Sequence, residues 1–162
     1  MNRKVVISDS GVIFSLAIIN ELNLLNLLFD KVLIPKAVWI EITKNIDTVY
    51  YKQIYNFFKD KIIEIKGENN LGIIMDYGES ESVILYKELN ADFLLIDDKK
   101  ARKIAESLNV NCIGTLGLLI YAKENKFINK LRPYFLEFIS NKRFYGKEIL
   151  NKILELQNEE KI

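Results

Sequence analysis

Short apolar runs alternate with longer amphipathic stretches along most of this chain. Several of the short runs are rich in β-branched residues and are bounded by polar or glycine-containing turns, which is typical of short buried strands. The longer stretches repeat their apolar residues at helical spacing. The predicted strands cover residues 5–7, 32–34, 62–65, 93–96 and 110–113, and the predicted helices cover residues 12–19, 22–29, 36–43, 50–58, 79–89, 99–108, 116–123, 131–140 and 146–156.

The alternation of strands and helices indicates βα units, and therefore an α/β fold built on a parallel sheet. Right-handed crossovers place the carboxyl ends of the strands on one edge of such a sheet. Ligand sites of open parallel sheets lie at that edge. Asp9 ends the first apolar run and Asp97 follows the run 93–96, so we expect both carboxylates there.

The candidate site residues are five acids, which we call the acid cluster: Asp9, Glu41, Glu79, Asp97 and Asp98. Glu41 and Glu79 fall in or at the start of predicted helices. Carboxylates collected from distant segments are what a hard cation such as Mg²⁺ requires. Without a cation such a cluster is costly, because like charges held close resist ionising together. The set therefore predicts metal-dependent phosphodiester chemistry.

Each acid also has a purely structural interpretation. Asp9 could cap the helix that follows it, and Asp97 or Asp98 could cap the helix that begins at residue 99. Glu41 could be a solvated helix residue. These interpretations do not account for a glutamate inside a helix together with two adjacent acids after a later strand, so the functional prediction rests on the joint pattern.

Glu79 has the strongest structural alternative. Asp76 precedes it by three residues, and this spacing resembles a capping box at the start of a helix. Glu81 is a nearby alternative for the same role in the acid cluster.

Composition limits the chemistry further. The chain has 162 residues, and we expect one domain spanning residues 1–162. It contains no histidine, which removes histidine acid–base catalysis, Ser-His-Asp triads and most zinc sites. The net charge is +1, so any contact with nucleic acid must come from local patches.

Cys112 is the single cysteine, which allows no intrachain disulfide and fits a reducing cytosol, so we expect a cytoplasmic protein. We interpret it as a small buried apolar residue, not a nucleophile. No secretory signal is evident. The apolar stretch 11–19 is too short to span a bilayer, so no membrane association is expected.

Basic residues begin directly after Asp98. They form a solvated helix face or bind a phosphate backbone beside the metal. Residues 142–145 combine two basic with two aromatic side chains and are a second candidate of this kind. Thr115 could cap its own helix or contact a phosphate or the metal shell. The predicted nucleic-acid contacts are Lys99, Lys100, Arg102, Lys103 and Thr115.

Several local motifs together resemble those of PIN-domain ribonucleases. Residues 8–13 resemble the opening Asp-Ser/Thr motif of that family, and residues 38–42 resemble its helical Val-x-x-Glu segment. Residues 78–82 and 95–102 resemble the Gly-Glu-x-Glu and Asp-Asp-x-x-Ala-Arg motifs of a PIN-like subfamily of unknown function akin to VapC toxins, and residues 114–117 match its Gly-Thr-x-Gly step. The motif core covers residues 4–125, and the helices within 126–162 lie outside it.

The resemblance implies a three-layer sandwich with a central parallel sheet of four to five strands between helices. It implies an acidic site that binds Mg²⁺ or Mn²⁺ and an endonuclease activity on single-stranded or structured RNA. It also implies a toxin role with a small antitoxin protein as partner. The chain departs from the family at Glu79, where many members carry Asp, so the reach of this side chain differs by one methylene.

Since the chain has no histidine, we expect the metal to activate the attacking water. Asp9 is the predicted central ligand. Glu41, Glu79 and either Asp97 or Asp98 are predicted to complete the site, directly or through water. One or two metal ions are compatible with this set.

Two other functions are compatible with parts of the pattern. A catalytically inactive PIN-like module could bind RNA or protein, although the full acid set argues against a dead site. A phospho-acceptor receiver domain is also α/β with clustered Asp, but it needs an acid pair at the first strand, and here the pair follows a later one.

An apolar stripe near the end of the chain recurs at helical spacing and must cover something apolar. It either packs on its own domain or forms an interface with an antitoxin or with a second copy of the chain in a homodimer. The stripe consists of Ile149, Leu150, Ile153 and Leu154.

Overall fold

The structure is a computed structural model that describes residues 4–143 and 145–162. Within these residues, five parallel strands form one sheet in the order β3-β2-β1-β4-β5. The parallel α/β architecture predicted from the sequence is therefore confirmed. The strands are β1 Val5–Ser8, β2 Lys31–Pro35, β3 Ile62–Ile63, β4 Phe93–Leu95 and β5 Cys112–Ile113.

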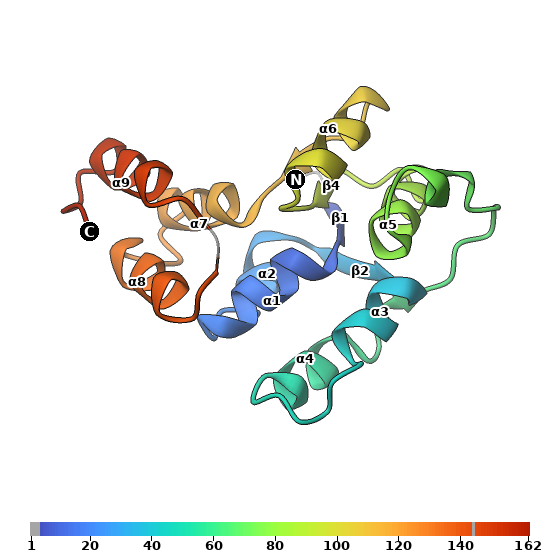
Figure 1. The fold of residues 1–162 in the computed structure, drawn as a ribbon, viewed down its shortest axis with the longest axis horizontal. Coiled ribbons are helices and arrows are strands. Elements are labelled where there is room, and N and C mark those ends of the chain that lie inside the picture. Colours follow the sequence, from blue (N-terminus) through green and yellow to red (C-terminus); the bar gives the residue numbers. More distant parts are fainter. Residues whose placement is uncertain (1–3, 144) are drawn as a thin grey trace.

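Helices connect the strands and continue the chain beyond the last one (Figure 1). They are α1 Ser10–Ile18, α2 Leu24–Leu28, α3 Lys36–Ile42, α4 Tyr51–Phe58, the short 3-10 helix η1 Asn70–Ile73, α5 Tyr77–Glu88, α6 Lys99–Ser107, α7 Thr115–Glu124, α8 Arg132–Ser140 and α9 Lys147–Leu156.

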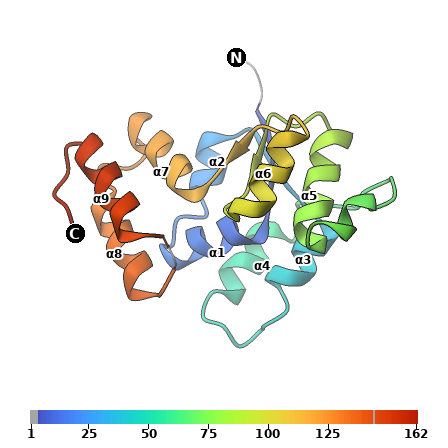
Figure 2. The same ribbon diagram turned by 45° about the horizontal axis from the view of Figure 1, so that its top comes forward.

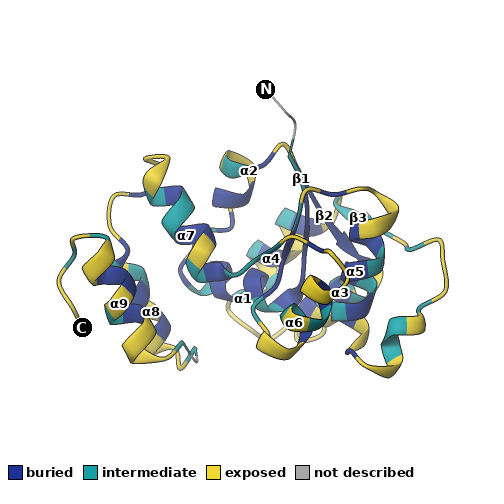
Figure 3. Cartoon of the chain, turned by 90° about the horizontal axis from the view of Figure 1, so that it is seen from above, coloured by how far each residue is buried: buried dark blue, intermediate teal, exposed yellow. Residues whose placement is uncertain are grey.

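Successive residues of a strand face opposite sides of the sheet, and here they enter two separate cores. Val6 of β1 and Leu95 of β4 pack with α1–α4 and α7–α9, whereas Ile7 and Leu94 pack with α5 and α6. Figure 2 shows α5 and α6 next to each other on their side of the sheet. In Figure 3 the strands are largely buried between helices whose outer surfaces are exposed. The fold is a three-layer sandwich.

After the neighbouring strands β1 and β4, the chain continues toward opposite edges of the sheet. The helices α1 and α2 lead from β1 to β2 on one face, whereas α6 leads from β4 to β5 on the other. Open parallel sheets bind ligands where the direction reverses in this way, outside the carboxyl ends of the strands. Asp9 and Asp97 follow β1 and β4, so the fold delivers both acids to this position.

The helices α7, α8 and α9 gather at one end of the molecule, beside α1 (Figure 1). Leu150 and Leu154 of α9 are fully buried and Ile153 nearly so, all three in the core that contains α1. Ile149 is 49% exposed and lies on the outer face of α9. The apolar stripe therefore packs on its own chain, except for Ile149.

The two edge strands are shorter than the sequence predicted. Strand β3 ends at Ile63 instead of residue 65, and β5 begins at Cys112 instead of residue 110. Strand β3 pairs only with β2 and ends opposite Pro35, the last residue of β2, whereas β5 pairs only with Leu94 and Leu95 of β4. In the described part of the chain, no helix has the length and apolar character needed to cross a membrane.

Candidate active site

Asp9 and Asp97 are brought together by the pairing of β1 with β4. Ser8 pairs with Leu95, and the backbone N–H of Asp9 donates to the Leu95 carbonyl at 2.9 Å. The chain reaches Asp97 two residues after Leu95. Acids that are distant in the sequence thus become neighbours at one sheet edge.

Asp9 is the most buried member of the acid cluster, with 5% of its surface exposed. It stands at the N-cap of α1, but its side chain makes no capping hydrogen bond to that helix, so the helix-cap interpretation is not supported. Its Oδ1 is buried and has no hydrogen-bond partner among the described residues. Burial raises the pKa of Asp9 to about 7; the charges of Glu41, Glu79 and Asp97 act in the same direction, and the Ser10 backbone N–H acts against them.

Glu41 reaches the same place from α3. Ser10 Oγ donates to Glu41 Oε1 at 3.0 Å, so this carboxylate is directed toward the segment that carries Asp9. Gly78 of α5 lies against its other oxygen: a Cβ on Gly78 would stand 2.6 Å from Glu41 Oε2 and 3.4 Å from Asp9 Oδ1. Glu41 is exposed, but it is not a freely solvated helix residue.

Glu79 caps its own helix and also borders the acid cluster. The backbone N–H of Asp76 donates to Glu79 Oε2 at 3.3 Å, which confirms the capping box. Burial raises the pKa of Glu79, and the charge of Asp98 adds to this effect while the hydrogen bond from Asp76 opposes it. Burial also raises the pKa of Glu81, the alternative, but the charges that act on it are those of Glu64 and Lys36 and not those of the acid cluster.

The two adjacent acids differ in what they contact. Asp98 is the N-cap of α6, where its Oδ1 accepts a hydrogen bond from the backbone N–H of Ala101 at 2.8 Å. Asp97 turns toward α7: the backbone N–H of Thr115 donates to Oδ1 and the Thr115 hydroxyl donates to Oδ2, each at 2.7 Å. Besides burial, the charge of Asp97 and not that of Asp98 contributes to the raised pKa of Asp9, so Asp97 is the acid of this pair that lies nearer to Asp9.

Thr115 is too deeply buried to contact nucleic acid, which corrects the prediction from the sequence. Its side chain is fully buried, and its hydroxyl donates to Asp97. It therefore supports a member of the acid cluster and does not present a surface to a phosphate.

The basic residues predicted to contact nucleic acid lie at the start of α6. Lys99, Lys100 and Lys103 are exposed. Arg102 is half-buried, and its guanidinium donates to Glu106 at 2.9 Å through Nε. The three lysines are thus the members of this group that are open to a ligand.

The acid cluster is open. Within residues 4–143 and 145–162, no three acidic or cysteine side chains already form a group that could hold a metal ion. The donor set nevertheless fits Mg²⁺ or Mn²⁺: every donor is a carboxylate oxygen, and one of them, Asp9 Oδ1, is buried without a partner.

Ser10, Gly78 and Tyr145 were not among the site residues predicted from the sequence. Ser10 and Gly78 adjoin Asp9 and Glu79 in the motifs, and this adjacency was the available signal. Tyr145 was noted only as part of the basic and aromatic segment 142–145, and nothing in the sequence pointed to its contact with Asp97, in which its hydroxyl donates to Oδ2 at 2.6 Å.

The segment 142–145 does not present its described side chains as an RNA-binding patch. Arg143 donates to Ser15 Oγ at 3.0 Å and to the Gly11 carbonyl at 2.8 Å, and Tyr145 contacts Asp97. Phe144 lies outside the described residues.

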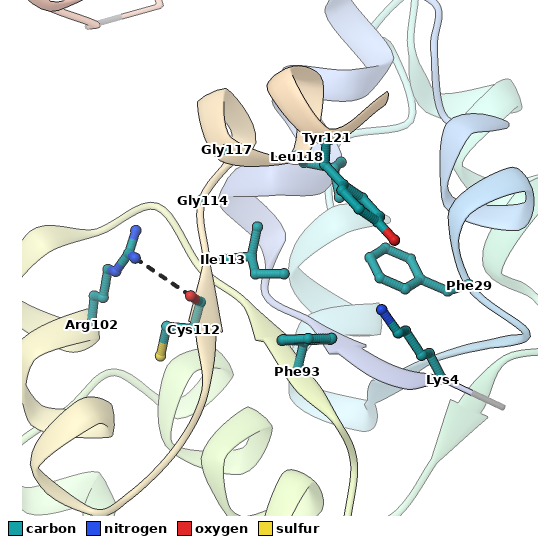
Figure 4. Close-up of a pocket in the computed structure, with 10 residues that line it drawn as sticks. All are labelled: Lys4, Phe29, Phe93, Arg102, Cys112, Ile113, Gly114, Gly117, Leu118 and Tyr121. Carbon is teal, nitrogen blue, oxygen red and sulfur yellow. Dashed lines mark hydrogen bonds between the residues drawn. The ribbon is translucent and has the colours of Figure 1, made fainter. Parts of the chain in front are cut away.

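A pocket of about 370 Å³ adjoins the acid cluster along the β4–β5 side of the sheet (Figure 4). Phe29, Phe93 and Tyr121 contribute to its walls, and the Lys4 ammonium lies 5.5 Å from the ring centroids of both Phe93 and Tyr121. Gly114 lines the pocket and also borders Asp97. No carboxylate is among the described lining residues, so the pocket is a neighbour of the acid cluster and does not contain it.

Cys112 is half-buried, which is less than the sequence led us to expect. Burial raises the pKa of its thiol to about 11. The thiol therefore stays protonated at neutral pH, which is unfavourable for a nucleophile.

Residues 5–159 match DUF3368, a family described as a PIN domain. Because this match covers nearly the whole chain, the chain belongs to that family. The match extends past residue 125, where the recognised motifs end, and includes helices α8 and α9. PIN domains are generally nucleases and typically use divalent metals. No curated protein matches the sequence.

Proposed function

We propose that this protein is an endoribonuclease that depends on Mg²⁺ or Mn²⁺. The observation that carries the proposal is the state of Asp9, which is buried among other acids with one oxygen unpartnered in the described structure. Burial and those acids raise its pKa to about 7. A carboxylate perturbed in this way, at the ligand-binding edge of a parallel sheet, is typical of a functional site.

Asp9 would be the central metal ligand. Glu41 and Asp97 would complete the site, and Glu79 would contribute directly or through water. A bound cation would supply a water of lowered pKa and would offset charge on the scissile phosphate. Asp98 keeps its role at the start of α6, where it holds Ala101.

The lysines of α6 would bind the RNA backbone. Lys99 and Lys100 directly follow the acid pair, and both are exposed together with Lys103. Since the net charge of the chain is only +1, binding must depend on such a local group. Weak, salt-sensitive binding follows from so few phosphate contacts.

We also propose that the enzyme acts as a toxin that a small antitoxin protein restrains. Exposed apolar side chains beside Glu79 support a protein partner on this side of the molecule: Ile73 is 91% exposed and Tyr77 is 72% exposed. An antitoxin that covers them would also obstruct the acid cluster. Expression of this chain alone should arrest growth, and co-expression of a small protein that binds it should restore growth; normal growth on expression of the active chain would contradict the toxin role.

The nuclease proposal is tested with purified protein and end-labelled single-stranded RNA. Cleavage is expected with Mg²⁺ or Mn²⁺, should stop in excess EDTA and should return when Mn²⁺ is restored. Because water is the proposed nucleophile, the fragments should carry no 2′,3′-cyclic phosphate, which distinguishes this activity from a contaminating ribonuclease that uses the 2′-hydroxyl. Cleavage that persists in EDTA contradicts the metal mechanism.

A catalytically inactive module that binds RNA or protein is the alternative. Two of the five acids favour it, since Asp98 and Glu79 have helix-capping roles that need no metal. Binding of RNA without any cleavage across a range of Mn²⁺ concentrations would support this alternative over the enzyme.

A further inference from the structure

A directed series of hydrogen bonds runs from the carboxyl-terminal part of the chain to Asp97. Arg143 Nε donates to Ser15 Oγ at 3.0 Å, Ser15 Oγ and the Tyr145 hydroxyl are 2.7 Å apart, and Tyr145 donates to Asp97 Oδ2 at 2.6 Å. A phenol has one hydrogen, so when Tyr145 donates to Asp97 the Ser15 hydroxyl must donate to Tyr145. All the donors in the series therefore point toward the carboxylate, an order in which each bond polarises the next.

We infer that Tyr145 is a positioning residue for Asp97, so that the segment after α8 completes a site whose motifs all lie earlier in the chain. This inference rests on the proposed function, because it assigns Asp97 to the metal. Tyr145 would act through Asp97 and would not touch the RNA.

The donors around Asp97 decide which of its oxygens remains available. Oδ2 accepts from both the Thr115 hydroxyl and Tyr145, which occupies its two lone pairs. Oδ1 accepts only the backbone N–H of Thr115 among the described residues, so it keeps one acceptor direction. Tyr145 and Thr115 together hold the carboxylate in one orientation and leave Oδ1 for a ligand.

Tyr145 is itself held in place. Its ring lies 4.9 Å from the ring of Phe138 in α8, centroid to centroid. Arg143 ties the same segment to α1 through the Gly11 carbonyl at 2.8 Å. A rigid donor of this kind can orient an acid, which is the usual role of groups that hydrogen-bond to metal ligands.

The test compares Tyr145→Phe with Tyr134→Phe in the full chain. The Tyr134 hydroxyl also donates to a carboxylate at 2.6 Å, that of Glu21, which is not part of the acid cluster. Each variant thus loses one phenol–carboxylate hydrogen bond and keeps its ring. Mn²⁺ binding is measured by electron paramagnetic resonance, urea unfolding and RNA binding are measured in EDTA, and RNA cleavage is measured in Mn²⁺.

Tyr145→Phe should bind Mn²⁺ about tenfold more weakly and cleave correspondingly more slowly, whereas Tyr134→Phe should match the wild type in both. RNA binding in EDTA should be unchanged in both variants, and the urea midpoints should shift to similar extents. Equal Mn²⁺ affinity of Tyr145→Phe and the wild type overturns the inference alone. Failure of the wild type to bind Mn²⁺ overturns the proposed function, and the inference with it.

Discussion

Gly78 and Glu41 meet between α5 and α3 so closely that a Cβ on Gly78 would stand 2.6 Å from Glu41 Oε2. Side-chain carbons do not approach an oxygen at this distance, so the Glu41 carboxylate would have to move. Asp9 Oδ1 lies 3.4 Å from the same point. The space left by the missing side chain is therefore shared by two of the proposed metal ligands.

Gly78→Ala should impair the acid cluster without destabilising the fold. Alanine is favoured over glycine in a helix by up to about 1 kcal/mol, so unfolding in EDTA should show equal or higher stability than the wild type. Displacement of Glu41 should weaken Mn²⁺ binding and slow RNA cleavage by about tenfold. Gly117→Ala in α7 is the matched control, because its Cβ would meet Ile113 Cγ2 at an ordinary 3.6 Å. Wild-type cleavage by Gly78→Ala would show that the placement of Glu41 is unimportant.

Thr115→Val should slow cleavage, because it removes the hydroxyl that donates to Asp97 and keeps the branched shape. Thr115→Ser keeps the donor and should stay close to the wild type. We expect about a tenfold difference in rate between the two variants at saturating RNA. An equal loss in both variants would point to packing around this buried residue instead of the hydroxyl.

A substitution at Asp97 should affect activity, whereas a substitution at Asp98 should affect mainly stability. Asp97→Asn is expected to remove metal-dependent cleavage, since Asp97 is the proposed ligand. Asp98→Ala is expected to lower the free energy of unfolding by about 1 kcal/mol through the lost cap on α6, and to keep most of the cleavage rate at temperatures where it is folded. The reverse assignment follows if Asp98→Ala is folded but inactive and Asp97→Asn still cleaves.

The stability of the metal-free protein should depend on pH through Asp9. Burial raises the pKa of Asp9 from 3.8 to about 7, so the folded protein keeps a proton that the unfolded chain releases near pH 4. The stabilising contribution is therefore complete below about pH 4 and is lost as the pH rises to about 7. The loss is on the order of 4 kcal/mol.

Asp9→Asn cannot ionise and should escape this loss. Urea unfolding in EDTA should find the variant more stable than the wild type at pH 8, with an advantage that shrinks toward pH 4. A difference that does not change with pH would show that Asp9 ionises normally in the folded protein.

The parallel sheet and the positions of Asp9 and Asp97 at its edge could be predicted from the sequence because their determinants are local. Asp9 and Asp97 each follow a short apolar run, and the parallel pairing of β1 with β4 brings the ends of these two runs together. The capping box of Asp76 and Glu79 is equally local and was also predicted.

The roles of Asp97 and Asp98 could not be separated from sequence, since both follow the same strand. Their difference depends on the partners of each carboxylate: the backbone N–H of Ala101, three residues on, caps Asp98, whereas the tertiary partners Thr115 and Tyr145 hold Asp97. Tyr145 lies 48 residues beyond Asp97 and reaches it only because α8 packs against α1. A contact of this range leaves no periodicity or spacing in the sequence.

The proposed role of the acid cluster as a metal-dependent centre for RNA cleavage is tested most directly by the cleavage rates of wild type and Asp9→Asn across a Mn²⁺ titration. Both proteins are purified identically and shown to be folded by their unfolding curves. The wild-type rate should rise with Mn²⁺ and saturate, while Asp9→Asn should remain at the level seen in EDTA. Identical Mn²⁺-dependent rates for the two proteins would contradict the account.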